Sequence, residues 1–321
     1  MANVYILSPI AQTGGIEAIF QLSNNLYKLG HTCTIFPMKG KIEVNGTSAL
    51  ISEEKSSYSH LYTKYKSEWS SHITLKEEDY LIIPEVYIKM SSNFKNLKCK
   101  KFIWWLSIDN AFAGFDKEWS KHSFFMDGTH YSFGHLYQSQ YALNFLEGVG
   151  ACDIFELKCY IGEEFIKNSF TQNERDDVIL YNPKKDSVYW EVLRHQCKDV
   201  LFTPLQGMTR EKMIETIQSS KIYIDFGSHP GMDRIPREAA LNGTVVLTGK
   251  RGSAINSVDI PIPDFFKFDT RDIYNGRCAE TINAILKNHN KYLAMQDYYR
   301  RVIKMQERAF ENAVFSLWGE G

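Results

Sequence analysis

The stretch that decides the fold reads Asp225-Phe-Gly-Ser-His-Pro-Gly-Met-Asp-Arg-Ile-Pro-Arg-Glu-Ala-Ala-Leu-Asn-Gly-Thr-Val-Val-Leu-Thr248. Apolar, β-rich residues stand at both of its ends, and they predict buried strands over 222–226 and 245–248. Between the strands, residues 236–241 predict a short helix, because Pro236 suits its first turn and Gly243 its C-terminal end. This order of strand, helix and strand is typical of a parallel sheet.

Polar side chains follow the first of these strands, at the carboxyl edge where open α/β sheets bind ligands. They are Gly227, Ser228, His229, Asp233 and Arg234. Arg234 and Arg237 lie beside a predicted helix N-terminus, whose free N–H groups and dipole favour phosphate, and Glu238 adds an acceptor. We therefore predict a site for a phosphorylated, hydroxyl-bearing ligand such as a nucleotide sugar. The alternative is a solvated loop with an internal Asp233–Arg237 pair.

Length and composition indicate a globular protein of two domains. The chain has 321 residues, of which 44% are hydrophobic and 14% aromatic, so a largely disordered chain is excluded. The net charge of −1 argues against a nucleic-acid partner. The first apolar run is too short for a signal peptide, and no run approaches the roughly 20 residues that span a bilayer.

The six cysteines form no Cys-x-x-Cys pair, which favours reduced thiols in a cytoplasmic protein over a zinc site or a disulfide framework. Peripheral contact with a membrane surface stays open. The sequence also lacks a P-loop, a Gly-x-Ser-x-Gly elbow and a His-Glu-x-x-His motif. The nine histidines show no spacing with carboxylates that predicts a metal centre, so we expect neither a metal nor a cofactor.

Alternating strand and helix patterns predict an α/β fold with two Rossmann-like halves. The expected strands are 4–8, 32–36, 80–84, 101–106 and 153–161 in the first half, then 178–181, 200–205, 222–226, 245–248 and 265–268. We expect domains at 1–166 and 167–290, followed by a C-terminal helical segment at 291–321. Residues 39–74 predict a polar, poorly periodic insertion, and 168–177 predict the hinge.

Further candidate residues follow other strands of the two halves. Gly14-Gly15 allows close backbone approach to an oxygen-rich ligand, or forms only a tight turn. The pattern is not Gly-x-Gly-x-x-Gly, so NAD binding has little support. Lys184 and Lys185 emerge at the edge that carries Arg234, where a lysine neutralises a diphosphate leaving group or is only a surface residue. Ser253 offers N–H and hydroxyl donors to the same phosphates.

Two candidates in the first half carry acid–base chemistry. Asp109 follows a buried strand and is placed to act on an acceptor hydroxyl, with a helix N-cap or Asx-turn as the alternative. His130 stands near Asp127 and forms a second candidate cluster, with a buried core histidine as the alternative reading.

On these residues the chain resembles the bacterial retaining glycosyltransferases of the GT-B architecture. The resemblance rests on Gly14-Gly15-Ile16-Glu17, Leu29-Gly30-His31, the helix after Ser139, Ile161-Gly162 and Pro236-Arg-Glu238-Ala-Ala-Leu-Asn-Gly243-Thr-Val-Val. It implies two Rossmann-like domains facing a cleft, the N-terminal one on the acceptor side and the C-terminal one binding the nucleotide sugar. It further implies that the helical segment at 291–321 returns to the first domain and that no metal is bound. It also implies sugar transfer with retention to a glycan or lipid-linked acceptor, as in the synthesis of bacterial surface polysaccharide.

The chain departs from that family at one member of its glutamate pair. Glu238 matches the second glutamate, which holds the ribose, but Pro230 stands where the first would fall, so His229 or Asp233 is expected to contact the sugar hydroxyls. Two alternatives remain. A CMP-sugar transferase is indicated by the His229-Pro230 and Asp127-Gly128 pairs, and an inactive nucleotide-sugar-binding protein by the missing glutamate.

Overall fold

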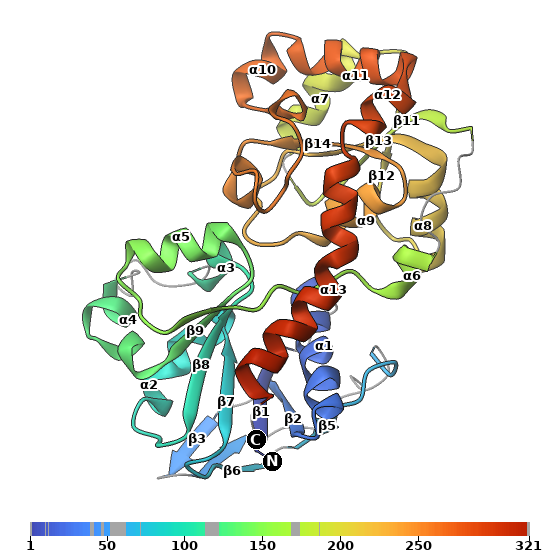
Figure 1. The fold of residues 1–321 in the computed structure, drawn as a ribbon. Coiled ribbons are helices and arrows are strands. Elements are labelled where there is room, and N and C mark those ends of the chain that lie inside the picture. Colours follow the sequence, from blue (N-terminus) through green and yellow to red (C-terminus); the bar gives the residue numbers. More distant parts are fainter. Residues whose placement is uncertain are drawn as a thin grey trace. The chain divides into compact units, whose positions relative to one another are not determined.

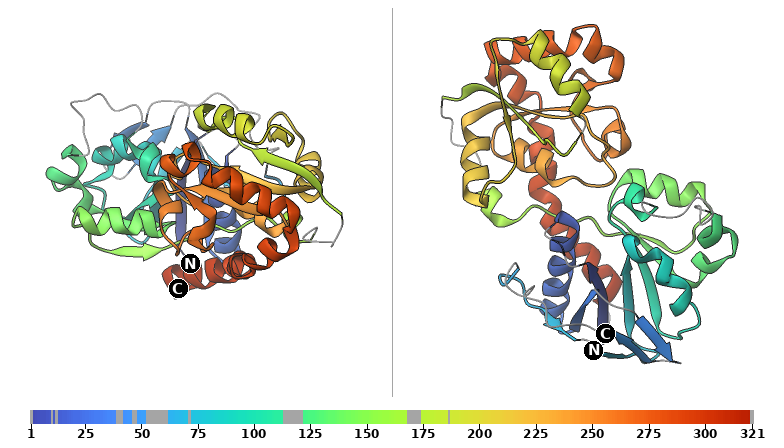
Figure 2. Two further views of the ribbon diagram at one scale, coloured as in Figure 1. Left: turned by 90° about the horizontal axis from the view of Figure 1, so that it is seen from above. Right: turned by 180° about the vertical axis from the view of Figure 1, so that it is seen from behind.

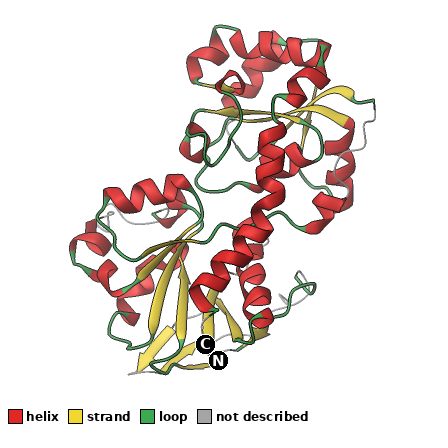
Figure 3. Ribbon diagram, viewed as in Figure 1, coloured by secondary structure: helices red, strands yellow, loops and turns green. Residues whose placement is uncertain are grey.

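A computed structural model describes residues 2–9, 11, 13–38, 42–45, 48–51, 62–70, 72–112, 122–167, 174–185 and 187–319. The chain forms two compact units (Figure 1). Unit 1 comprises Met1–Cys159 with Arg308–Gly321, and unit 2 comprises Tyr160–Glu307. These boundaries lie at 159/160 and 307/308, whereas the sequence placed them at 166/167 and 290/291. Each unit contains one parallel sheet with helices packed against it, which confirms the predicted α/β class (Figure 3).

Unit 1 is built on a seven-stranded sheet of order β10-β9-β8-β7-β1-β2-β5, with every pairing parallel. The strands are β1 (Asn3–Pro9), β2 (Thr32–Met38), β5 (Glu68–Trp69), β7 (Tyr80–Pro84), β8 (Lys100–Trp105), β9 (Gly134–Tyr137) and β10 (Ile154–Glu156). The helices are α1 (Gly14–Lys28), η2 (Glu85–Met90), α2 (Ser91–Phe94), α3 (Ile108–Ala111), α4 (His122–Met126), η3 (Thr129–Ser132) and α5 (Gln140–Gly148).

The local sequence explains why these elements form. Ile19, Leu22 and Leu26 recur at helical spacing, are fully buried, and hold α1 beside the sheet (Figure 2). The hydroxyl of Ser139 caps α5 by accepting from the backbone N–H of Ala142 at 3.1 Å. A buried amphipathic helix and a capped one thus follow directly from residue spacing and type.

The expected insertion at 39–74 contains more regular structure than its sequence indicates. The strands β3 (Ile42–Asn45), β4 (Ser48–Ile51) and β6 (His72–Thr74) form a three-stranded antiparallel sheet, and β5 joins the edge of the main sheet. Strands of two to four residues are too short to show a clear alternation, which explains the missed prediction. Residues 39–41, 46–47, 52–61 and 71 of this segment lie outside the described residues.

Unit 2 is built on a five-stranded parallel sheet of order β12-β11-β13-β14-β15. Its strands are β11 (Asp176–Tyr181), β12 (Leu201–Pro204), β13 (Ser220–Asp225), β14 (Val245–Gly249) and β15 (Lys267–Phe268). Its helices are α6 (Glu163–Lys167), α7 (Ser187–Gln196), α8 (Arg210–Ser219), α9 (Arg234–Leu241), η4 (Gly252–Ile255), η5 (Asp264–Phe266), α10 (Thr270–Tyr274), α11 (Arg277–Lys287) and α12 (His289–Ala294). Of the expected hinge at 168–177, residues 168–173 lie outside the described residues.

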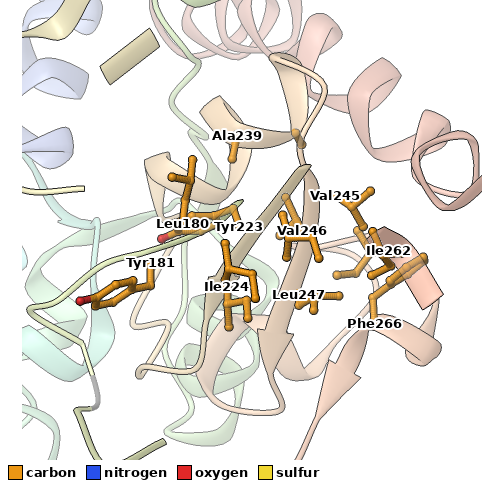
Figure 4. Packing of buried hydrophobic residues seen from close by; sticks show 14 of the residues in the cluster. Leu180, Tyr181, Tyr223, Ile224, Ala239, Val245, Val246, Leu247, Ile262 and Phe266 are labelled. Atoms are coloured by element: carbon orange, nitrogen blue, oxygen red, sulfur yellow. The ribbon is translucent and has the colours of Figure 1, made fainter. Parts of the chain in front are cut away.

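The central strands of unit 2 are buried on both faces, as the apolar runs predicted (Figure 4). Ile224 of β13 and Val246 and Leu247 of β14 are fully buried, and Ala239 of α9 packs in the same cluster. This rigid pair of strands supports the loop that carries the candidate site.

The helix α13 (Asp297–Trp318) contributes to both units. Its last residues complete unit 1, where Trp318 is 2% exposed and its ring centroid lies 6.1 Å from that of Tyr80. His31 Nε2 donates to the carbonyl of Trp318 at 2.6 Å. The C-terminal end of α13 is therefore part of the core of unit 1. Among the described helices, none combines the length and the apolar character that crossing a bilayer requires.

Candidate functional site

Parallel pairing brings two distant segments of unit 2 to the same edge of its sheet. Strands β11 and β13 are neighbours in register, with Tyr181 opposite Ile224. Lys185 follows the end of β11, and Asp225 is the last residue of β13. The two side chains meet at this carboxyl edge, the place where open α/β sheets bind ligands.

Four residues form what we call the Lys185 cluster: Lys185, Asp225, His229 and Asp233. The ammonium group of Lys185 lies 3.1 Å from Oδ2 of Asp225 and 2.6 Å from Oδ2 of Asp233. His229 Nε2 donates to the backbone carbonyl of Asp225 at 3.2 Å, and Nδ1 lies 2.8 Å from Oδ2 of Asp233. One lysine thus joins two carboxylates from the ends of the same loop.

The charges of the cluster stabilise one another. Burial disfavours the charged form of Lys185, but the carboxylates of Asp225 and Asp233 outweigh it and raise the pKa of the lysine. Burial likewise opposes ionisation of Asp233, yet the neighbouring His229 and Lys185 lower its pKa. Lys185 and Asp233 therefore both stay charged at neutral pH.

Two neighbouring residues, Gly227 and Asp225, determine the position of the Lys185 side chain. A Cβ on Gly227 would lie 2.6 Å from Cδ of Lys185, so only glycine leaves room for the side chain. Asp225 is held by the hydroxyl of Tyr223 at 3.0 Å and by the backbone N–H of Gly227 at 3.2 Å. The position of the ammonium group is thus determined by packing as well as by charge.

The helix α9 begins at Arg234, two residues before the predicted start, so Pro236 is its third residue. Arg234 Nε donates to Oε1 of Glu238 at 3.1 Å, one turn further on. The two predicted ligands Arg234 and Glu238 are therefore paired with each other, and both are largely buried. Asp233, the residue before the helix, belongs to the Lys185 cluster.

The structure does not support a direct phosphate contact for Arg237. Its side chain is 1% exposed, and it donates to the carbonyls of Asp233 and Met232 and to Oε1 of Gln306. These distances are 3.1, 2.9 and 2.9 Å. The sequence placed Arg237 beside a helix N-terminus but could not show that its side chain is buried in unit 2.

Ser253 is also a structural residue in this structure. Its hydroxyl donates to the carbonyl of Gly231 at 2.6 Å, and its backbone N–H donates to the carbonyl of His229 at 2.7 Å. Ser253 is 1% exposed, so its donors hold the 227–233 loop instead of facing a ligand. By contrast, Ser228 and Lys184 are exposed at the same edge of the sheet.

The predicted residues of unit 1 make separate contacts. Gly14 and Gly15 are the first residues of α1, and a Cβ on Gly15 would lie at van der Waals distance, 3.4 Å, from Cδ1 of Leu106. Asp109 is exposed, accepts from the hydroxyl of Tyr141 at 3.0 Å, and helps to line a pocket of about 460 Å³. Its volume lies within the range of pockets that bind small molecules.

His130 has the environment of a core histidine. It is 2% exposed, lies between aromatic rings, and its Nδ1 is 3.3 Å from the carbonyl of Phe124. Burial lowers its pKa, so the imidazole is neutral at pH 7. Its predicted partner Asp127 instead accepts from the backbone N–H of Thr129 at 2.8 Å, as in an Asx-turn.

Two buried carboxylates were not predicted as site residues. Asp225 ends β13, and its spacing of four and eight residues to His229 and Asp233 is a signal that the sequence contained. Ligand atoms of these three residues lie within 4.8 Å of one another, which corrects the expectation that no histidine clusters with carboxylates. Glu85 follows β7 and accepts from the backbone N–H of Leu106 at 3.0 Å, a contact that no sequence pattern indicates.

Comparison with solved structures shows that the fold is GT-B. HepE from Anabaena, crystallised with UDP, matches with a TM-score of 0.69 and 10% identity, covering 99% of each chain. Sucrose-phosphate synthase from Thermosynechococcus elongatus matches with the same score and identity over 99% of this chain and 98% of that one. S. aureus TarM in a complex with UDP matches with a TM-score of 0.64, 10% identity and 99% coverage of both chains.

No protein-family model matches the chain, and no curated protein matches it. At about one identical residue in ten, the structural likeness shows the fold alone. It confirms the GT-B part of the sequence resemblance over the full length of the chain.

Proposed function

We propose that this protein is a glycosyltransferase that moves a sugar from a nucleotide-sugar donor to a glycan or lipid-linked acceptor. The reaction serves the synthesis of bacterial surface polysaccharide, proceeds with retention, and needs no bound metal. The proposal is supported by the GT-B fold together with the charged carboxyl edge of the unit 2 sheet. A cytoplasmic location, with peripheral contact to a membrane surface, belongs to the same proposal.

The observation that carries the proposal is the way Lys185 is held. An ammonium group has three N–H donors, and Asp225 and Asp233 are the two partners that the described residues supply. The side chain is 20% exposed, so a third donor is left for a phosphate oxygen. A cation fixed in a largely buried site stabilises the charge that develops on a departing diphosphate.

Glu238 is proposed to hold the ribose of the donor, as the resemblance implies. It accepts a hydrogen bond from Arg234, the first residue of α9, which follows the loop of the Lys185 cluster. Asp109 of unit 1 is proposed to contact the acceptor hydroxyl, because it is exposed beside a pocket. HepE and TarM were both solved with UDP, so a UDP-sugar is the first donor to test.

The test is calorimetric titration of the purified protein with UDP, GDP and CMP, followed by release of UDP from UDP-sugars with and without EDTA. We expect UDP to bind, and Glu238→Gln to raise its Kd about tenfold through a lost charge-assisted hydrogen bond. Glu215→Gln, an exposed carboxylate on α8, is the matched control and should leave the Kd unchanged.

Each other outcome selects a different reading. Preferential binding of CMP favours the CMP-sugar transferase, and binding of UDP without turnover of any UDP-sugar favours an inactive binding protein. A folded protein that binds none of the three nucleotides contradicts the proposal. Loss of activity in EDTA contradicts its metal-independent part.

A further inference from the structure

The Lys185 cluster has the composition of a metal centre but contains an amino group. Two carboxylates and an imidazole, from Asp225, Asp233 and His229, place ligand atoms within 4.8 Å of one another. Nitrogen and oxygen ligands of this kind suit Zn²⁺ and other divalent first-row metals. The ammonium group of Lys185 lies at hydrogen-bonding distance from both carboxylates, at 3.1 and 2.6 Å.

The imidazole of His229 adds a third potential ligand atom beside the two carboxylates. His229 is completely buried, and its Nε2 donates to the carbonyl of Asp225. Its Nδ1 lies 2.8 Å from Oδ2 of Asp233, so the imidazole is paired with that carboxylate. A divalent ion would take the place of the proton between these two atoms, because a histidine binds a metal through a ring nitrogen that has lost its proton.

A divalent ion and the lysine cannot both occupy the cluster. Metal ligands of this type lie about 2.0–2.2 Å from a zinc ion. An ion at that distance from the oxygens of Asp225 and Asp233 would take the space of the ammonium group and repel its charge. Because Gly227 leaves room for the aliphatic part of Lys185, the lysine side chain packs in a fixed position within the site.

We propose that Asp225, His229 and Asp233 form a divalent-cation site that the ammonium group of Lys185 keeps closed. Shortening the lysine opens this site to a transition metal, while the unaltered protein excludes it. The hydroxyl of Tyr223 and the backbone N–H of Gly227 already hold Asp225 in place, as partners of a metal ligand do. The inference goes beyond the proposed function, since it needs neither a nucleotide nor a sugar.

The experiment is a titration of the EDTA-treated, nucleotide-free protein with Co²⁺, followed by calorimetry and by the visible absorption of bound cobalt. We expect Lys185→Ala to bind one Co²⁺ at least about 100-fold more tightly than the unaltered protein, because two buried carboxylates have lost their cation. Lys185→Arg keeps a positive charge in the site, so this variant should bind Co²⁺ no more tightly than the unaltered protein. Lys184→Ala removes an exposed neighbouring lysine and should change nothing.

The double variant Lys185→Ala/His229→Ala tests the ligand set and should lose the visible bands. If Lys185→Ala alone is poorly folded, Co²⁺ should raise its unfolding temperature, since a ligand that binds the folded state stabilises it. The inference is overturned if the unaltered protein binds Co²⁺ as tightly as Lys185→Ala. It is also overturned if Co²⁺ neither binds nor stabilises that variant. Neither result depends on UDP binding, so the proposed function is tested separately.

Discussion

A buried carboxylate lies at the carboxyl edge of each parallel sheet, and its pKa is shifted in opposite directions in the two units. In unit 2, Asp233 lies 2.6 Å from the ammonium group of Lys185, and its pKa is lowered. In unit 1, Glu85 is 2% exposed and accepts from the backbone N–H groups of Leu106 and Ser107. Burial raises the pKa of Glu85 to about 8, because backbone donors do not offset the loss of water.

The two sheet edges therefore differ in the fixed charge that they offer to a ligand. A neighbouring cation favours the ionised form of a buried carboxylate, whereas burial alone favours the protonated form. At pH 7 the edge of unit 2 therefore has both signs of charge in fixed positions, whereas Glu85 at the edge of unit 1 is mostly neutral. This contrast supports the proposed division between a unit that binds a charged donor and one that binds a hydroxylated acceptor.

The largest expected effect comes from Arg237→Ala, which tests whether this arginine is structural. Its removal leaves the carbonyls of Met232 and Asp233 and the amide oxygen of Gln306 without their donor. At about 1 kcal/mol for each buried acceptor, we expect a loss of about 3 kcal/mol in the free energy of unfolding. Urea denaturation measures it. Unchanged stability combined with weaker UDP binding would restore the phosphate role that the sequence suggested.

The next effect is that of Gly252→Ala, which acts on the loop that holds the Lys185 cluster. Gly252 has φ of +54°, and a Cβ there would lie 2.1 Å from the carbonyl oxygen of His229. The left-handed backbone costs about 1–2 kcal/mol for any other residue, and the clash adds to it. We expect a loss of about 2–3 kcal/mol in unfolding free energy and weaker UDP binding.

Gly207→Ala is the matched control for this substitution. Gly207 has φ of +68°, but its Cβ would meet nothing within 4 Å. Its cost should be that of the backbone alone, about 1 kcal/mol. The comparison between the two glycines isolates the contact with His229. Equal losses in both variants would mean that the loop moves aside without cost.

Much of the fold could be predicted because its buried strands are continuous apolar runs. The strand 80–84 was predicted with the bounds of β7, and the predicted strand 245–248 lies within β14. The strand β9 (Gly134–Tyr137) was missed, since its four residues include a histidine. That histidine, His135, is buried because Nε1 of Trp105 donates to its Nδ1 at 3.0 Å, a contact that no local pattern reveals.

The candidate site was predictable only in part. The sequence placed Lys185, His229 and Asp233 at one edge, because each follows a recognisable strand. It could not show that Asp225 and Lys185, forty positions apart, share a hydrogen bond, since that depends on the register of β11 and β13. Nor could it distinguish Arg234 from Arg237, because the direction of each side chain depends on the rotation of α9.

The smallest expected effect concerns Glu85, and it depends on pH. Because the pKa of Glu85 is raised to about 8 from a usual value of 4.5, the folded protein binds a proton that the unfolded chain releases. The stability that this proton contributes is fully present below pH 4.5 and is lost as the pH rises toward 8 and beyond. Between pH 6 and pH 8 we expect the unfolding free energy to fall by about 2 kcal/mol at most.

Glu85→Gln removes this titration and keeps the shape and an accepting oxygen for the N–H of Leu106. Its unfolding free energy, measured by urea denaturation from pH 5 to pH 9, should be flatter than that of the unaltered protein and should exceed it at the alkaline end. Glu77→Gln, an exposed carboxylate beside Lys98, is the control and should follow the unaltered curve. Parallel curves for Glu85→Gln and the unaltered protein would mean that Glu85 is ionised in the folded state, and the contrast between the two sheet edges would then be wrong.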